Sequence, residues 1–229
     1  MTFLELVQRL FNEAAIEGTS PATVTGQTGM AGRCVNWIQD AYKDIQGEHW
    51  NWDFLEAAIS FATTSGNREY SLATMGLTDL AEYKTGKDNQ SLSGLKLYKT
   101  SVTDEQDLLF IPWEHFNQIY NLGSLRNNTG RPVVFSIGSS KSLHFWPTPD
   151  DAYTVSGRYY KAPSELSGND DTPIFDNHHM VIVWRALMFY AGFEESASKF
   201  TFANNEYMKL LSKLERDSLP MYYYGAPLS

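Results

Sequence analysis

The side chains that could catalyse a reaction or bind a metal ion do not fall into the spacings that such sites use. Asp176, His178 and His179 lie close together, but adjacent residues on a helix point about 100° apart, so the two histidines do not form a chelating i, i+4 pair. A more ordinary interpretation is that Asp176 or Asn177 caps a helix and that at least one histidine packs at a domain or subunit contact. An enzyme with a spatially assembled site, such as a metal hydrolase around His178 and His179, stays open as a third class.

Motifs for nucleophilic attack and phosphate binding are also missing from the sequence. It contains no G-x-S-x-G elbow, no G-x-x-x-x-G-K-[ST] loop and no G-x-G-x-x-G loop. The single cysteine, Cys34, lies on the apolar stripe of a predicted helix, so we expect a buried structural thiol. The glycine-containing polar loop at 18–29 has no lysine and is predicted to be a linker or a docking loop. We therefore expect no enzymatic activity, no cofactor and no metal site.

The charge balance argues against a protein whose main task is to hold nucleic acid. The chain has 18 Lys and Arg against 27 Asp and Glu, a formal net charge of −9, whereas binding a nucleic acid backbone requires clustered cations. One polar loop could touch phosphate or could be an ordinary exposed turn. It contains Arg126, Asn127, Asn128, Gly130 and Arg131. An acidic wall past which nucleic acid slides is compatible with this charge.

Aromatic residues make up 14% of the chain, which favours packed interfaces as well as a core. We predict interface residues near the end of the second helix and after a helix-stopping proline: Trp37, Trp50, Trp52, Met221, Tyr222, Tyr223 and Tyr224. The tyrosine-rich segment is expected to dock on another subunit or on its own chain, with a free tail as the remaining possibility. Alternatively, Trp113 and Trp146 on a β domain could stack on sugars.

Other features narrow the class of protein further. No apolar run approaches about 18 residues, so we expect no membrane span, and the first residues do not look like a signal peptide. One cysteine excludes a disulfide framework within the chain. With 229 residues, the chain is expected to form one domain or two small ones.

Hydrophobic periodicity predicts helices at both ends of the chain and strands between them. A capping box, Thr2 to Glu5, begins a helix over 3–17 that Gly18 is expected to end. Further helices are predicted over 29–49, 113–122, 176–191 and 201–217, and strands over 58–63, 68–72, 95–98, 108–111, 133–137, 142–146 and 153–160. The segment 64–67 is predicted to be a hairpin turn that joins the first two strands.

This order of elements predicts an α+β fold, in which N- and C-terminal helices form a helical bundle with an inserted antiparallel β domain. The predicted domains are a helical domain over 1–56 and 164–219, an antiparallel β domain over 57–163, and an extended C-terminal tail over 220–229. The two helical pairs are expected to pack on each other, because neither pair buries both of its faces alone.

Several segments together resemble a known family. They are 10–14 (LFNEA), 21–29 (PATVTGQTG), 37–46 (WIQDAYKDIQ), 130–132 (GRP), 145–150 (FWPTPD), 159–163 (YYKAP), 171–173 (DTP), 179–187 (HMVIVWRAL) and 219–220 (LP). In this order they resemble the head-to-tail adaptor, or connector, proteins of tailed bacteriophages. The resemblance extends over nearly the whole chain, and its motifs are structural.

The resemblance implies a structural virion protein of the phage neck, assembled in the host cytoplasm. It implies a ring below the portal, usually dodecameric like the portal, through which DNA passes without specific binding. The implied partners are the portal protein, further copies of the chain and a downstream tail protein of the nozzle or tail tube. No active-site residues carry over from the family. The alternative is a tail-associated β-domain module that binds a glycan or host receptor.

Overall fold

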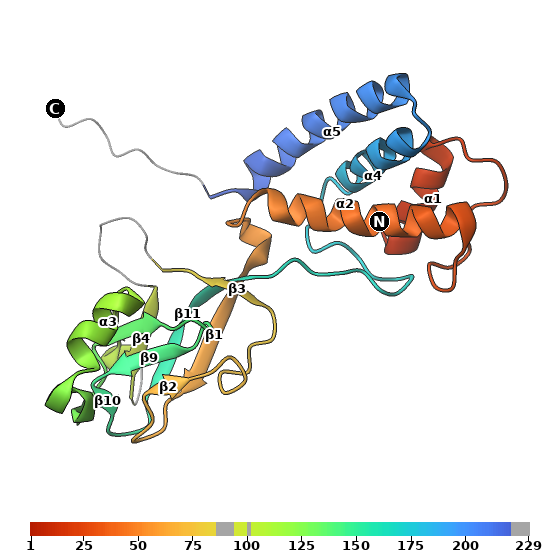
Figure 1. The fold of residues 1–229 in the computed structure, drawn as a ribbon. Helices are drawn as coiled ribbons and strands as arrows, with labels where there is room; N and C mark the ends of the chain where they lie inside the picture. The colour runs from red at the N-terminus through yellow and green to blue at the C-terminus, as the bar shows by residue number, and fades with distance from the viewer. Residues whose placement is uncertain (86–93, 100–101, 221–229) are drawn as a thin grey trace, which may run out of the picture. The chain divides into compact units, whose positions relative to one another are not determined.

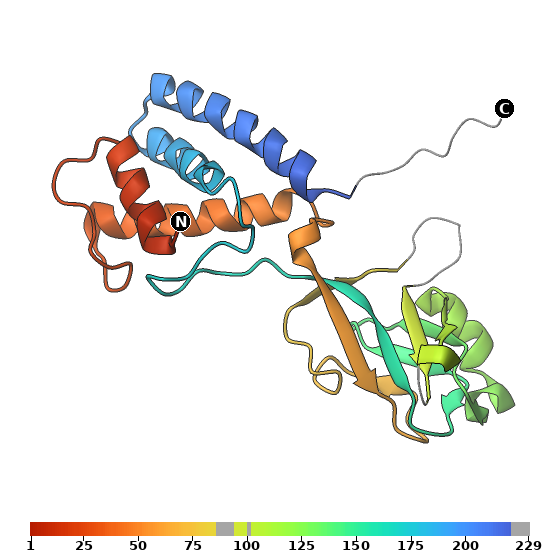
Figure 2. The ribbon, with the colours of Figure 1, turned by 180° about the vertical axis from the view of Figure 1, so that it is seen from behind.

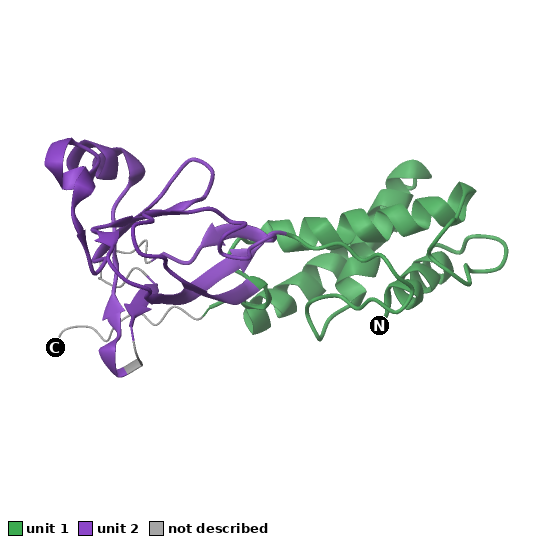
Figure 3. Cartoon of the chain, turned by 90° about the horizontal axis from the view of Figure 1, so that it is seen from below, with its two compact units in different colours: residues 1–55, 163–229 green, residues 56–162 purple. Residues whose placement is uncertain are grey.

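The computed structural model describes residues 1–85, 94–99 and 102–220. Its fold is α+β, as predicted. The chain divides into two compact units, residues 1–55 with 163–229 and residues 56–162, which we call the helical unit and the β unit (Figure 3). The core cluster of the β unit is made only of residues from that unit.

The helical unit contains α1 (Phe3–Glu13), α2 (Gly29–Glu48), α4 (Met180–Phe193) and α5 (Ala197–Ser218), with a short 3-10 turn, η1 (Asp53–Leu55) (Figure 1). Helix α4 packs against the other three helices. Its residues Val181, Ile182 and Val183 are all buried although they point in different directions around the helix axis. A helix that is apolar on all sides belongs in a core, so α4 is the centre of this unit.

Helix α1 begins as the sequence predicts and ends earlier. The Thr2 hydroxyl accepts a hydrogen bond from the Glu5 amide, and the Glu5 carboxylate accepts one from the Thr2 amide, which confirms the capping box. The helix ends at Glu13, because Ala15 adopts a left-handed conformation with φ of 55°. The prediction that the helix continues to 17 and ends at Gly18 was therefore wrong.

Helix α4 begins later than predicted. Its N-cap is His179, which makes no side-chain capping hydrogen bond, so the predicted cap by Asp176 or Asn177 was wrong. His178 stands just before the helix in a left-handed conformation, with φ of 62°, and its ring bonds to the Asp217 carboxylate on α5. The start of α4 is thus set by the preceding loop and its contact with α5, not by a local cap.

The β unit is made of short strands with one helix, α3 (Trp113–Tyr120), and two 3-10 turns, η2 (Val102–Asp104) and η3 (Gly123–Asn127). Its strands are β1 (Glu56–Ala62), β2 (Glu69–Tyr70), β3 (Leu80–Tyr83), β4 (Leu95–Tyr98), β5 (Gln106–Asp107), β6 (Leu109–Phe110), β7 (Thr129–Gly130), β8 (Val134–Ile137), β9 (Leu143–Trp146), β10 (Thr148–Pro149) and β11 (Thr154–Lys161).

These strands form three sheets. One has the order β1-β11-β4-β5 with β3 also on β11, a second has the order β2-β9-β8-β6, and β10 pairs with β7. The first and last strands of the unit are neighbours, because β1 and β11 pair antiparallel from Glu56 opposite Tyr160 to Ala62 opposite Thr154 (Figure 2). Most pairs are antiparallel as expected, but β6 with β8 and β7 with β10 are parallel.

The predicted hairpin between the first two strands was wrong. Strand β1 pairs with β11, whereas β2 pairs with β9 in a different sheet. The turn at 64–67 carries the chain from one sheet to the other. It is held there because the Gly66 amide donates to the Pro149 carbonyl and the Tyr70 hydroxyl donates to the Asn67 carbonyl.

The core of the β unit is rich in aromatic rings and draws on strands of both larger sheets. Tyr70, Phe135 and Phe145 are fully buried, and the Tyr70 and Phe145 rings meet edge to face with centroids 5.5 Å apart. Because such rings bury large apolar areas, they help the short strands to hold together.

Candidate assembly surfaces

Two of the three predicted interface tryptophans offer surface on the helical unit. Trp37 is half-buried on α2, with its ring 5.9 Å from Tyr190 and 5.8 Å from Phe193. Phe193 is exposed, and the Arg33 guanidinium lies 4.6 Å over its ring. Trp50 is exposed in the loop after α2. Both places present aromatic surface of the kind that protein interfaces use.

Trp52 differs from this expectation because it lies in the core of the helical unit. It is fully buried, its indole Nε1 donates to the Ile45 carbonyl at 3.0 Å, and its ring stacks on Phe54. A buried, hydrogen-bonded indole stabilises the fold and has no surface left for a partner. The other predicted interface residues, Met221 and Tyr222 to Tyr224, lie outside the described residues.

Polar side chains of α2 hold the irregular segment 164–174 against the helix. The Gln46 amide donates to the Ser164 carbonyl at 3.1 Å, and its oxygen accepts from the Ser164 amide at 2.9 Å. Gln39 makes the same paired contact with the main chain of Leu166. The Tyr42 hydroxyl accepts from the Ile174 amide at 3.0 Å. The motif at 37–46 is therefore a clamp on the chain that returns from the β unit.

Two motifs that are distant in the sequence meet in the β unit. Gly130, from the segment 130–132, pairs with Pro149, from the segment 145–150, in the short parallel sheet of β7 and β10. The Thr148 amide also donates to the Asn128 carbonyl at 2.9 Å. Arg131 turns away and binds Asp104 at 2.7 Å. These motifs are therefore part of the framework of the β unit.

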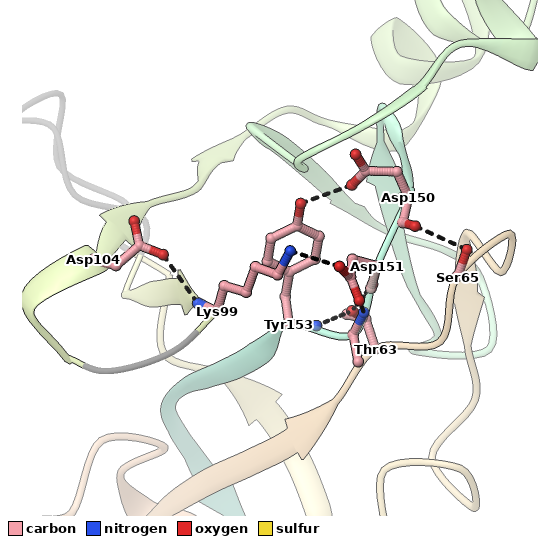
Figure 4. Close-up of polar contacts among 8 residues, drawn as sticks. Thr63, Ser65, Lys99, Asp104, Asp150, Asp151 and Tyr153 are labelled. Carbon is pink, nitrogen blue, oxygen red and sulfur yellow. Dashed lines mark hydrogen bonds and ion pairs between the residues drawn. The ribbon is translucent and has the colours of Figure 1, made fainter.

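A polar network follows this framework and fixes the loop before β11 (Figure 4). The Tyr153 hydroxyl donates to the Asp150 carboxylate at 2.7 Å, and burial together with this carboxylate raises the pKa of Tyr153 to about 12. The Thr63 hydroxyl accepts from the Tyr153 amide and donates to the Asp151 carbonyl. The Asp151 carboxylate pairs with Lys99 at 2.6 Å. Since both carboxylates already have donors, this network is a structural lock.

The candidate metal ligands serve separate partners. The His178 ring bonds to Asp217 at 2.9 Å, whereas the His179 ring bonds to the Phe175 carbonyl at 2.7 Å and to the N-terminal amine at 2.6 Å. Burial lowers the pKa of His179. No group of three or more metal-binding side chains occurs within the described residues. Cys34 is buried as predicted, and burial raises the pKa of its thiol to about 11, which is unsuited to nucleophilic attack.

The two arginines of the predicted phosphate-contact loop are not brought together. Arg131 binds Asp104, whereas Arg126 donates to the Asn121 carbonyl and lines a cavity with Arg68, Trp113 and other residues. The sequence analysis missed Arg68. It lies far from Arg126 in the chain, beside β2, and no local pattern indicates that the two guanidinium groups share a cavity.

Comparison with known proteins agrees with this framework of structural motifs. No helix of the described residues is long and apolar enough to cross a bilayer. No curated protein matches the chain. The model of one family, the SU10 adaptor protein, matches residues 1–228. Because this match extends across both units, the chain belongs to the SU10 adaptor protein family, a family of phage head-to-tail adaptors that are structural components of the virion.

Proposed function

We propose that the chain forms a ring under the portal, continues the DNA channel there and attaches the tail. The observation that carries this proposal is the family match over residues 1–228, which includes both units. The mechanism is geometric: copies bind the portal protein, close a ring that is expected to be dodecameric, and present a platform to the downstream nozzle or tail-tube protein. We further propose that the helical unit is the ring-forming domain and that the β unit is an insertion in it.

The charge distribution supports a channel wall that does not hold DNA. The chain has a net charge of −9, and several of its arginines are neutralised by carboxylates. Arg131 pairs with Asp104 and Arg185 pairs with Asp44. Binding of the DNA backbone needs free cations that contact several phosphates at once. A surface with few such cations favours passage of DNA without specific binding.

Exposed aromatic residues support contacts between copies. A ring that closes through one kind of contact joins two different patches of neighbouring copies, so each copy needs two unlike surfaces. The patch around Trp37 and Phe193 and the exposed ring of Trp50 are candidates for such surfaces. The tail over 220–229 is proposed to bridge to a neighbour, on the basis of its sequence.

The first test is the copy number of the chain in purified virions, measured by quantitative mass spectrometry against the portal protein. A ratio near one is expected, because a ring that follows the portal has one copy for each portal subunit. Absence of the chain from the particle contradicts the adaptor function, and a ratio far from one indicates a fibre, decoration or tip protein instead.

A matched pair of variants tests the proposed interface. Trp50 and Phe202 are both 55% exposed, so replacing either one by alanine removes a similar aromatic surface. Trp50→Ala is expected to reduce incorporation of the chain into particles, because large aromatic side chains at an interface supply much of its binding energy. Phe202→Ala is the control and is expected to leave incorporation unchanged. Equal incorporation of both variants removes Trp50 from the interface.

Glycan binding is a second candidate function, and one observation favours it. Trp113 lines an open cavity of the β unit together with Asn121 and Asn127, and an aromatic ring beside amides can hold a sugar. The indole Nε1 of Trp146, by contrast, already donates to the Leu125 carbonyl. Binding to a glycan array that is lost in Trp113→Ala supports this function, and an array without signal opposes it.

A further inference from the structure

The cavity beside α3 lies entirely within the β unit and is open to solvent. Its volume is about 640 Å³. Its wall is formed by the turn before β2, by β2 itself, by helix α3 with the residue that follows it, by turn η3, and by strands β7, β9 and β10. Polar side chains in this wall include Arg68, Glu69, Asn121, Arg126, Asn127 and His144. A cavity of this size can hold several side chains of a bound peptide.

The two arginines of this cavity differ from most others in the chain. Within the described residues, five of the eight arginines form an ion pair with a carboxylate: Arg9, Arg131, Arg158, Arg185 and Arg216. Arg33, Arg68 and Arg126 do not. Two of these three share one cavity, although the chain has an excess of nine acidic side chains. Among the described residues, neither arginine of the cavity forms an ion pair, although Glu69 also lines it.

Hydrogen bonds within the protein leave some donors of these guanidinium groups available in the cavity. Arg126 donates from Nε and Nη2 to one acceptor, the Asn121 carbonyl, and its Nη1 has no partner among the described residues. Nη1 of Arg68 donates to the Asn121 side chain at 3.3 Å, whereas its Nη2 is buried and has no hydrogen-bond partner. The Asn127 side chain has no partner within the described residues either. A buried donor without an acceptor costs free energy, so an incoming acceptor is favoured.

Electrostatic effects within the cavity also favour the binding of an anionic acceptor. Burial lowers the pKa of the Arg68 guanidinium, and the charge of Arg126 lowers it further. Glu69 opposes this effect, but its carboxylate is exposed at the rim and lies 3.7 Å from His144. Burial lowers the pKa of His144, which favours its neutral form at pH 7. The wall is then left with two cations and one anion, and a further anion between the arginines would reduce their repulsion.

The size and charge of the cavity distinguish among possible anions. A DNA strand presents phosphates in series and would need cations beyond the two arginines, on a chain whose net charge repels it. A neutral sugar would leave the charge of the guanidinium groups uncompensated. A single carboxylate on a peptide fits both the size and the charge of the cavity, because guanidinium groups bind carboxylates with charge-assisted hydrogen bonds. Trp113 and the free amide of Asn127 can contact the flanking peptide.

We propose that this cavity is a docking site for an acidic peptide segment of a protein partner, whose carboxylate binds between Arg68 and Arg126. The Asn127 side chain donates to the same segment or to its main chain. The site gives the β unit a specific protein contact that does not depend on apolar surface. It requires no ring, so it can be tested on the purified chain whether or not the proposed portal ring exists.

The test uses two short peptides, acetyl-Ala-Glu-Glu-Ala-amide and its glutamine counterpart, with binding measured by calorimetry and by amide chemical shifts. We expect the glutamate peptide to bind more tightly than the glutamine peptide and to shift the signals of residues around the cavity. Raising the salt concentration is expected to weaken this binding. The variant Arg126→Gln is expected to bind the glutamate peptide about tenfold more weakly, since a charge-assisted contact is lost. Arg126 is exposed, so this variant should fold normally.

The matched control is Arg33→Gln. Arg33 is the third arginine that has no carboxylate partner among the described residues, and it lies in the helical unit. Its replacement should therefore leave peptide binding to the β unit unchanged. Equal affinity in Arg126→Gln and the parent chain overturns the proposal. So does equal binding of the two peptides, or no binding at millimolar concentration. A DNA duplex or a neutral oligosaccharide that shifts the same signals while the glutamate peptide does not would assign the cavity to another class of ligand.

Discussion

Two groups of polar side chains, one in each unit of this protein, differ in how completely they are hydrogen-bonded within the chain. In the helical unit, Gln39, Tyr42 and Gln46 of α2 bind main-chain groups of the segment 164–174. In the β unit, Arg68 and Arg126 line an open cavity with donors that have no partner among the described residues. Polar side chains with complete hydrogen bonds hold the chain, whereas those with incomplete ones are available to another molecule.

The units also differ in what fills their cores. The helical unit surrounds one apolar helix, α4, whereas the β unit packs aromatic rings from strands that are mostly four residues or shorter. Short strands have few ladder hydrogen bonds, so the rings must supply much of the stability of the β unit. In the helical unit the clamp of α2 adds polar contacts to the apolar packing.

The largest effect is expected from Phe145→Ala in the core of the β unit. Phe145 is fully buried and contacts both Phe61 and Tyr70, so the variant should lose about 3–5 kcal/mol of unfolding free energy. Urea denaturation followed by hydrogen exchange should show strands β8 and β9 losing protection while α4 keeps its own. The control Phe200→Ala, at a 44% exposed position on α5, should change stability by less than about 0.5 kcal/mol. Equal losses of protection in α4 and β9 would show that the two units do not lose structure independently.

A smaller effect is expected from Gln46→Leu in the clamp of the helical unit. The side chain is buried, and its loss leaves the amide and the carbonyl of Ser164 without partners, which should cost about 1–3 kcal/mol. Thermal unfolding measures the change, and hydrogen exchange should locate it at residues 164–166. The exposed position Asn205 on α5 provides the control, because Asn205→Ala should be nearly neutral. An unchanged transition in Gln46→Leu means that the clamp does not stabilise the unit.

The smallest effect is a pH dependence of the β unit that comes from His144. Burial lowers the pKa of this histidine in the folded chain, so the unfolded chain binds its proton more readily. Stability should therefore be complete above the ordinary histidine pKa of about 6.5 and decrease as the pH falls through the folded value. The difference in stability between pH 7.5 and pH 5, measured by denaturation, is expected to shrink in His144→Gln.

The helical unit supplies the comparison for this pH effect. His179 also has a pKa lowered by burial, so His179→Gln should alter the pH response of the helical unit and leave that of the β unit unchanged. A response of the β unit that persists in His144→Gln contradicts the assignment, because other groups would then carry it.

The sequence was sufficient wherever the cause of the structure is local. The capping box at Thr2 and Glu5 set the start of α1, and the apolar stripe that contains Cys34 indicated a buried face of α2. The α+β class followed from the change of hydrophobic period along the chain. The prediction was wrong where a neighbouring segment decides the conformation. The turn at 64–67 passes between two sheets because Pro149 and Tyr70 hold it there.

For the candidate sites the same distinction holds. Sequence alone indicated the family to which the chain belongs, because its motifs are local properties. It placed Trp52 at an interface, whereas the tertiary structure buries this ring against Phe54. Only the fold shows that Arg68 and Arg126 share one cavity. Periodicity and composition determine which elements form, but packing decides which distant side chains meet and which are left without partners, because these contacts join residues far apart in the chain.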